Sequence, residues 1–258
     1  MNLELQGKTA LVSGSTAGIG LAIATALARE GANVIVNGRT EERVKHAIEK
    51  SGAADGIAAD LGTEEGARLV TGRFPAVDIL VNNLGIFEST PFEQISDADW
   101  RRFFEVNVLS GVRLSRHYLA GMQRQNWGRI VFISSESGLQ IPAEMVHYGM
   151  TKTAQLAVSR GLAQITAGTG ITVNAVLPGP TASEGVTGFV EGLARQRGVD
   201  RAQVEREFFE HVRPSSLIRR FATPEEVAAM VVFVCSPLAA AVTGAALRVD
   251  GGVVQSIA

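Results

Sequence analysis

Short apolar runs rich in β-branched residues recur along the chain, and segments with helical spacing lie between them. The runs begin at Thr9, Asn33, Asp78, Arg129, Ile171 and Ala245, with a weaker seventh at Asp55, and helical spacing covers Leu21–Arg29, Trp100–Met122, Tyr148–Thr166 and Pro224–Cys235. The runs are almost continuously apolar, which is typical of strands covered on both faces of a parallel sheet. This alternation predicts an α/β fold, a doubly wound parallel sheet of about seven strands with helices on both faces, in one domain over residues 1–258.

Composition argues against several classes of function. The net charge is −2 and no Lys/Arg stripe is present, so nucleic acid is not an expected partner. Cys235 is the one cysteine, which leaves no intrachain disulfide, and the four histidines lack the spacing of a metal site, so no metal is expected. The first apolar run is too short for a signal peptide and no run approaches about 20 apolar residues, which predicts a cytoplasmic protein away from membranes.

Three glycines follow the first predicted strand, in "ALVSGSTAGIGLAIATALA". Gly14, Gly18 and Gly20 stand where a strand turns into a helix, the context in which a dinucleotide pyrophosphate meets helix N-terminal amides. Strand-to-helix turns also use glycine for steric reasons alone, so the trio is weak evidence without its partners.

The end of the second predicted strand bears on which dinucleotide is bound. An acidic residue here usually binds the ribose 2′-hydroxyl of NAD, but the sequence has Gly38 followed by Arg39. A guanidinium binds a phosphate through two hydrogen bonds, so NADP(H) is favoured over NAD(H). The alternative is that Arg39 is a solvated turn residue and that the site does not discriminate between the two cofactors.

A phenol and an ammonium lie four residues apart in "HYGMTKTAQLAV". Tyr148 and Lys152 share one helix face, and a nearby positive charge favours the phenolate, which makes the tyrosine usable as a general acid or base. Ser135 ends a strand upstream, where its hydroxyl is expected to hold a carbonyl oxygen. Asn107 places an amide in a mostly apolar helix, where it needs a partner.

Together these motifs resemble the short-chain dehydrogenase/reductase family, in the short single-domain branch that includes the 3-oxoacyl reductases. "SGSTAGIG" is similar to the family's T-G-x-x-x-G-x-G with Ser13 for Thr, and "NNLG" to N-N-A-G with Leu84 for Ala. The segments "ISSESG", "YGMTK", "LPGPTAS" and "ADL" match further family motifs. The family spacing, a serine thirteen residues before the tyrosine, selects Ser135 over Ser134 and Ser137.

The resemblance implies a Rossmann-like fold and hydride transfer between a nicotinamide and a substrate carbon. Tyr148 then exchanges the proton on the substrate oxygen, Ser135 orients that oxygen, Lys152 binds the nicotinamide ribose and lowers the pKa of Tyr148, and Asn107 holds a water linking Lys152 to solvent. The implied cofactor-binding residues are Gly14, Ser15, Gly18, Ile19, Gly20, Arg39, Asp60, Leu61, Asn83, Gly85, Tyr148, Lys152, Pro178, Gly179 and Thr181. Family members commonly form tetramers, so a homotetramer or homodimer is expected.

Residues 181–221 interrupt the strand and helix rhythm with a long, charged, glycine-punctuated stretch. Long functional loops often close over sites, which predicts a substrate lid beside the nicotinamide. The apolar side chains of the stretch either line an apolar pocket or only attach two short helices to the core; they are Phe189, Leu193, Phe208 and Phe209.

Substrate class is indicated by two turns. Family members that reduce acyl-carrier-protein thioesters tend to have arginines where Asn126 and Thr169 stand here, although Arg124 and Arg129 are close enough to compensate in part. A free ketone or secondary alcohol is therefore favoured over a 3-oxoacyl thioester.

Two further classes of protein are compatible with the motifs but less favoured. A catalytically silent NADP-binding regulatory protein would keep the fold without turnover, and the intact set of Asn107, Ser135, Tyr148 and Lys152 argues against it. A nucleotide-sugar epimerase or dehydratase would keep the tyrosine and lysine, but that branch usually has a longer C-terminal substrate domain than this sequence offers.

Overall fold

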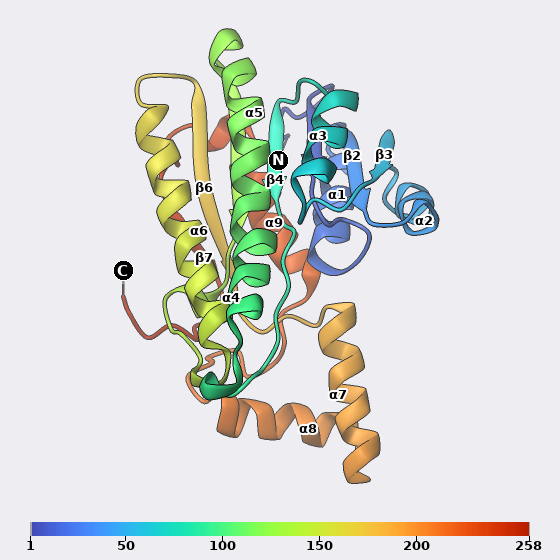
Figure 1. The fold of residues 1–258 in the computed structure, drawn as a ribbon, viewed down its shortest axis with the longest axis vertical. Coiled ribbons are helices and arrows are strands. Elements are labelled where there is room, and N and C mark those ends of the chain that lie inside the picture. The colour runs from blue at the N-terminus through green and yellow to red at the C-terminus, as the bar shows by residue number, and fades with distance from the viewer. Residues whose placement is uncertain (1, 258) are drawn as a thin grey trace.

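The computed structural model describes residues 2–257, the side chain of Phe189 excepted, and its centre is a parallel seven-stranded sheet. The strands are β1 Thr9–Val12, β2 Asn33–Gly38, β3 Asp55–Ala58, β4 Ile79–Asn82, β5 Gly128–Ile133, β6 Ile171–Pro178 and β7 Ala246–Val249. They lie in the order β3-β2-β1-β4-β5-β6-β7 (Figure 1). Strand order reverses between β1 and β4, the point at which doubly wound sheets open a crevice. The predicted fold class is confirmed.

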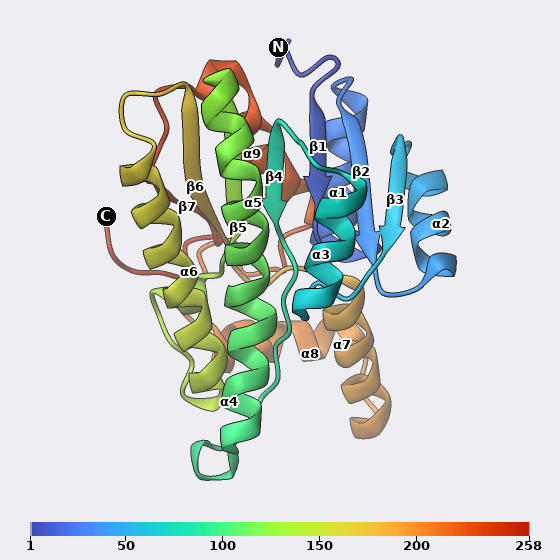
Figure 2. The same ribbon diagram turned by 45° about the horizontal axis from the view of Figure 1, so that its top comes forward.

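Helices cover both faces of the sheet (Figure 2). One face carries α1 Gly18–Arg29, α2 Glu41–Ser51 and α9 Pro224–Cys235, and the other carries α3 Glu64–Arg73, α4 Asp97–Phe104, α5 Ser110–Gln125 and α6 Val146–Ile165. Short turns are η1 Phe92–Gln94, η3 Glu136–Gly138, η4 Ala143–Met145 and η6 Pro237–Ala239. No helix in the described part combines the length and apolar character that crossing a bilayer requires.

Alternate residues of each strand lie in two separate apolar cores, one on each face of the sheet. Val12 and Val36 face α1 and α9, whereas Leu11 and Ile35 face α3 and α5, as the two-residue period of a strand dictates. Both sets are buried, which explains why the strands read as continuous apolar runs. Cys235 lies in the first core, and its burial raises the pKa of the thiol to about 12.

The helical run expected over Trp100–Met122 is not one regular helix. A widened π-helical turn, η2 Glu105–Leu109, separates α4 from α5. Asn107 lies in this turn, and its side chain bonds both backbone groups of Ile86, 2.8 Å from the nitrogen and 3.0 Å from the oxygen. Insertion of side chains into a helical ladder is a recognised cause of such turns, and π-turns are frequent at functional sites.

Residues 181–221 project beyond the carboxyl ends of the strands (Figures 1 and 2). They form α7 Glu184–Arg197, α8 Arg201–Glu207 and the π-helical turn η5 Phe208–Val212. Phe208 and Phe209 pack on Phe221 with ring centres 5.1 Å apart, and the buried residues of the segment form their own cluster. For these two rings the structure favours the attachment role over a pocket; the side chain of Phe189 lies outside the described residues.

One side chain that the sequence did not single out holds the strand ends together. Asn37, at the end of β2, accepts from the Gly14 amide at 3.2 Å and donates to the carbonyl of Ala59 at 3.0 Å. Its own amide donates to Ser15 Oγ at 2.9 Å. A buried carboxamide therefore fixes the glycine loop to β2 and to the end of β3.

We predict that Asn37→Ala lowers the free energy of unfolding by about 2 to 3 kcal/mol, because it removes a side-chain partner from the Gly14 amide and from the Ile57 and Ala59 carbonyls. Urea denaturation followed by circular dichroism measures the change. The control is Asn33→Ala, at the exposed start of the same strand, where one long hydrogen bond to Gly7 is lost. Equal effects of the two substitutions would contradict this role for Asn37.

Candidate active site

The glycine loop between β1 and α1 has the backbone that its sequence predicts. Gly14 and Gly18 adopt φ of 59° and 54°, which other residues rarely adopt. A Cβ on Gly20 would lie 2.5 Å from the Gly14 carbonyl oxygen and 2.4 Å from Asn83 Nδ2, so a side chain is excluded there. No side-chain hydrogen bond caps the α1 N-terminus within the described residues, and Ser15 and Ile19 lie on either side of it, which suits an anionic ligand.

Two short side chains tie this loop to the end of β4. Ser13 Oγ accepts from the amides of Asn83 and Leu84 at 2.9 and 3.0 Å. The Asn83 carboxamide in turn donates to the Ser13 and Gly14 carbonyls at 3.0 and 2.9 Å. Serine in place of the family's threonine therefore still joins the ends of β1 and β4.

The space beside Gly38, where an NAD site would place an acidic side chain, is occupied by Thr16. A Cβ there would lie 2.3 Å from Thr16 Cγ2, so an aspartate would require Thr16 to move. Arg39 follows at an exposed position. Asp60 is exposed beside the same edge, whereas the Leu61 side chain is buried in the second core and leaves only its backbone to a ligand.

The predicted catalytic residues come together from three elements at the carboxyl ends of β4 and β5. Tyr148 and Lys152 lie on α6, Ser135 follows β5, and Asn107 comes from η2. Lys152 Nζ lies 5.5 Å from the centre of the Tyr148 ring and donates to the Ile133 carbonyl at 3.0 Å. A Cβ on Gly85 would lie 3.3 Å from that Nζ, so Gly85 keeps the approach to the ammonium open.

The last predicted group lies after β6. A Cβ on Gly179 would come within 2.5 Å of the Asp250 carbonyl oxygen, which requires glycine beside Pro178. Thr181 Oγ1 donates to the Gly179 carbonyl at 2.9 Å, and Thr181 forms a parallel bridge with Ala222. The predicted residues therefore all lie at the ends of β1, β2, β3, β4, β5 and β6 or on α1, α6 and η2 beside them.

Gln155 is a polar partner that sequence reasoning missed. Its Oε1 accepts from Lys152 Nζ at 3.2 Å, and its Nε2 donates to the Asn107 carbonyl at 2.6 Å. The Asn107 side-chain amide, for which a water partner was expected, bonds to Ile86 and Thr151 instead, and the water that links Lys152 to solvent remains a prediction. The available signal was a glutamine inside the apolar run "AQLAV".

Burial dominates the electrostatics of the site. It lowers the pKa of Lys152 to about 8. It raises the pKa of the half-buried Tyr148 phenol, and the Glu136 carboxylate raises it further, while the Ser135 hydrogen bond and Arg213 oppose this. The net direction of the Tyr148 pKa is therefore opposite to the lowering expected from the Tyr148 and Lys152 pair, because desolvation is the largest effect on the phenol.

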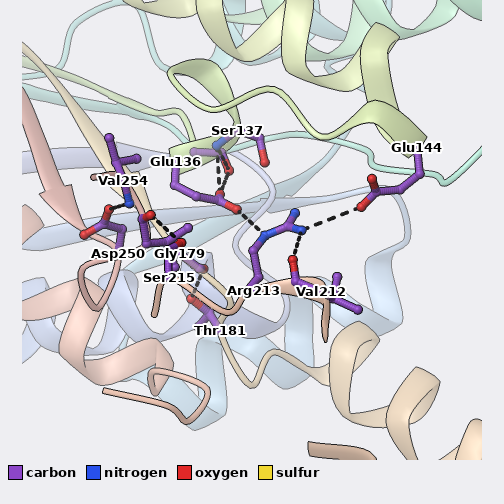
Figure 3. A network of polar contacts seen from close by, with 12 residues as sticks. Glu136, Ser137, Glu144, Gly179, Thr181, Val212, Arg213, Ser215, Asp250 and Val254 are labelled. Carbon is purple, nitrogen blue, oxygen red and sulfur yellow. Dashed lines mark hydrogen bonds and ion pairs between the residues drawn. The ribbon is translucent and has the colours of Figure 1, made fainter. Parts of the chain in front are cut away.

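A carboxylate beside Ser135 is the second group that sequence reasoning missed. Glu136 accepts from Ser135 Oγ and from the Ser137 amide, and it pairs with Arg213 Nε at 3.2 Å. Arg213 also lies 3.7 Å from Glu144, between the two carboxylates (Figure 3). The residue directly after η5 is thereby attached to the loop that carries Ser135.

The expectation that Arg129 compensates in part for the missing docking arginines is wrong, because this side chain is buried. It is 2% exposed, donates to the carbonyls of Gly128 and Gly170 at 2.9 Å, and stacks on Trp127. It cannot compensate on the surface for the missing arginine at Asn126. Asn126 itself ends α5 with φ of 52° and accepts from the Gly170 amide at 2.9 Å.

The fold and the grouped tyrosine, lysine, serine and asparagine define a doubly wound α/β enzyme. The model of the family described as Enoyl-(Acyl carrier protein) reductase matches residues 14–254. The uncharacterized oxidoreductase YvaG of Bacillus subtilis is 51% identical over all of both chains, and D-beta-hydroxybutyrate dehydrogenase of Cupriavidus necator is 38% identical over 96% of this chain and 98% of its own. The crystal structure of L-sorbose reductase from Gluconobacter frateurii, complexed with NADPH and L-sorbose, is 32% identical with a TM-score of 0.93 over 100% of both chains. The chain belongs to the short-chain dehydrogenase/reductase family and is an oxidoreductase.

We predict a pH signature of the buried Lys152. The unfolded lysine has an ordinary pKa of 10.5 and the folded one about 8, so the unfolded state binds more protons between these values and stability rises with pH there. The free energy of unfolding of the wild type should gain about 3 kcal/mol on that of Lys152→Met between about pH 7.5 and 10.5. Urea denaturation without cofactor measures the difference, and a constant difference across this range would refute the assignment.

Proposed function

We propose that the chain is an NADP(H)-dependent oxidoreductase that interconverts a small ketone and a secondary alcohol, with Tyr148 as general acid/base. The observation that carries this is the convergence of Tyr148, Lys152, Ser135 and Asn107 on one open edge of the sheet. The structure of L-sorbose reductase with NADPH and L-sorbose supports a reaction of this type on a small hydroxylated substrate.

Each residue has a role that its surroundings allow. The cofactor, when bound, supplies or accepts the hydride. Tyr148 exchanges the proton on the substrate oxygen, and Ser135 holds that oxygen at the same place. Lys152 presents Nζ toward the opening at Gly85 for the ribose hydroxyls, held by Ile133 and Gln155. Asn107 fixes the π-helical turn against Thr151 of α6 at 3.0 Å.

The glycine loop fits a dinucleotide. Positive φ at Gly14 and Gly18 and the close contact at Gly20 form a cradle that side chains would fill. NADP(H) is preferred because Gly38 and Thr16 exclude an acid while Arg39 offers a guanidinium to a 2′-phosphate. The remaining cofactor contacts are proposed at Ser15, Ile19, Asp60, Leu61, Asn83, Gly85, Pro178, Gly179 and Thr181.

The second candidate, reduction of a 3-oxoacyl thioester on a carrier, is weakened by Arg129. Because Arg129 is buried, Arg124 is the one of these two arginines that is exposed near the expected docking turns. The 181–221 segment is proposed to act as the substrate lid, and a cytoplasmic homotetramer remains the expected assembly.

We predict that Tyr148→Phe lowers kcat by about 10³-fold or more, because the general acid/base is removed, while the Kd for NADPH changes by less than about threefold. The assay follows NADPH and NADH absorbance over a panel of ketones, diketones and 3-oxoacyl thioesters. The control is Tyr118→Phe, the other tyrosine, whose hydroxyl only donates to the Phe74 carbonyl at 2.8 Å. Undiminished turnover in Tyr148→Phe would disprove the mechanism.

We predict that Arg39→Ala raises the Kd for NADPH by about tenfold or more and leaves the Kd for NADH within about twofold, because a charge-assisted contact to phosphate is lost. Fluorescence titration of the reduced cofactors measures both constants. Lys50→Ala, at the exposed far end of α2, is the matched charge control. Parallel weakening of both cofactors in Arg39→Ala would remove the basis for the NADP(H) preference.

A further inference from the structure

A cavity of about 1050 Å³ lies on the outer side of the glycine loop, between α1, α2, α9 and the start of α7. The part of its wall nearest the loop is formed by Thr16, Ala17, Gly18, Arg43 and Glu184. Thr16 also lies against the end of β2, since a Cβ on Gly38 would be 2.3 Å from Thr16 Cγ2. The cavity therefore begins beside Gly38 and Arg39, where the 2′-phosphate of NADP(H) is proposed to bind.

Arg43, the third residue of α2, extends its guanidinium along this wall to the first residue of α7. Its Nη2 lies 3.8 Å from Glu184 Oε2, and the two side chains are 52% and 74% exposed. This distance is longer than a hydrogen bond, and exposed ion pairs of this kind are weak. A phosphate, which accepts two parallel N–H bonds from one guanidinium, is a stronger partner for Arg43 than this carboxylate.

The charges near the end of β2 leave a phosphate site incomplete without Arg43. Arg39 offers one guanidinium, but Glu41 and Glu42 follow it in the first turn of α2, and Ala17 in the glycine loop adds no charge. A phosphate monoester carries a charge of about −1.5 to −2 at neutral pH. One arginine beside two carboxylates does not offset that charge, whereas a second guanidinium on the same turn of α2 does.

Resting on the proposed NADP(H) function, we propose that Arg43 exchanges partners when NADP(H) binds. Its guanidinium leaves Glu184 and binds the 2′-phosphate together with Arg39. Glu184 is therefore a competitor of the phosphate, and it weakens the binding of NADP(H) without acting on NAD(H), which lacks this group.

The same exchange connects the choice of cofactor to residues 181–221. A Cβ on Gly18 would lie 3.3 Å from Ser183 Cβ, so the start of this segment lies against the glycine loop. The pair of Glu184 and Arg43 joins the next residue to α2. Occupation of the phosphate site removes this second attachment, and an NAD(H) molecule leaves it in place.

A second ion pair on the same helix provides matched controls. Glu191 of α7 lies 3.9 Å from Arg201 of α8, with side chains that are 52% and 49% exposed, and neither residue lines the cavity. The other charged or titratable side chains that line the cavity are Arg29, Glu42, His46, Lys50 and Glu225. Apart from Glu42, they lie on later turns of α1 and α2 or on α9.

The first test uses only the part of the cofactor that carries the phosphate. Adenosine 2′,5′-bisphosphate and adenosine 5′-monophosphate differ by the 2′-phosphate, and calorimetric titration gives the Kd of each. For the bisphosphate, Glu184→Gln should lower the Kd by about threefold or more and Arg43→Met should raise it by about fivefold or more. Glu191→Gln and Arg201→Met should change it by less than about 1.5-fold, and no variant should change the Kd of the monophosphate by more than about 1.5-fold.

Competition requires that the effect of Glu184 pass through Arg43. In an Arg43→Met background, Glu184→Gln should change the logarithm of the Kd by less than about half as much as it does in the wild type. An equal effect in both backgrounds would show that Glu184 acts only by repulsion at a distance and would overturn the proposal, as would an unchanged or higher Kd in Glu184→Gln. Both side chains are exposed, so neither substitution leaves a buried group unpaired.

The second test uses the whole cofactors. In fluorescence titrations, the ratio of the Kd for NADH to the Kd for NADPH should rise about threefold in Glu184→Gln and fall about fivefold in Arg43→Met. If the wild type prefers NADPH through Arg39 while the Arg43 and Glu184 variants behave like the wild type, this inference is overturned and the proposed function stands. If the wild type binds NADPH no more tightly than NADH, the NADP(H) preference in the proposed function is wrong and this inference falls with it.

Discussion

A buried ammonium group is the constraint around which this site is arranged. Lys152 is 4% exposed, and its acceptors within the described residues are both neutral, the Ile133 carbonyl and the Gln155 amide. Such a group is costly in the free protein, and its lowered pKa expresses that cost. Polar groups of a ligand that reach Nζ past Gly85 would reduce this cost, so the burial of Lys152 favours binding of such a ligand.

The π-helical turn at Glu105–Leu109 follows from the same constraint. It directs the Asn107 side chain toward Ile86 and Thr151 and leaves its carbonyl to Gln155, which holds Lys152. The side-chain amides of Asn107 and Gln155 therefore link η2 to α6 through hydrogen bonds. Ile133 and Gln155 together accept two of the three hydrogens of the Lys152 ammonium, which leaves the third for another partner.

The sequence predicted the parts of this arrangement that depend on local pattern. Strand and helix periodicity, the glycine loop and the i, i+4 pair of Tyr148 and Lys152 are all short-range signals, and the sheet confirms the fold. Asn37, Gln155 and Glu136 were missed because their partners are distant: Glu136 pairs with a residue 77 positions away. Arg129 was misjudged because its buried guanidinium bonds to the carbonyls of Gly170 and Ser236, which lie 41 and 107 residues away along the chain.

The Glu136 and Arg213 pair connects the 181–221 segment to the loop that carries Ser135. Residues 181–221 pack largely on themselves through Phe208, Phe209 and Phe221, so their position over the strand ends depends on few contacts. Arg213 reaches the loop of Ser135 through a buried charge pair. Because both side chains of this pair are buried, loss of either partner would leave an uncompensated charge, so the end of η5 and the loop of Ser135 depend on each other for their positions.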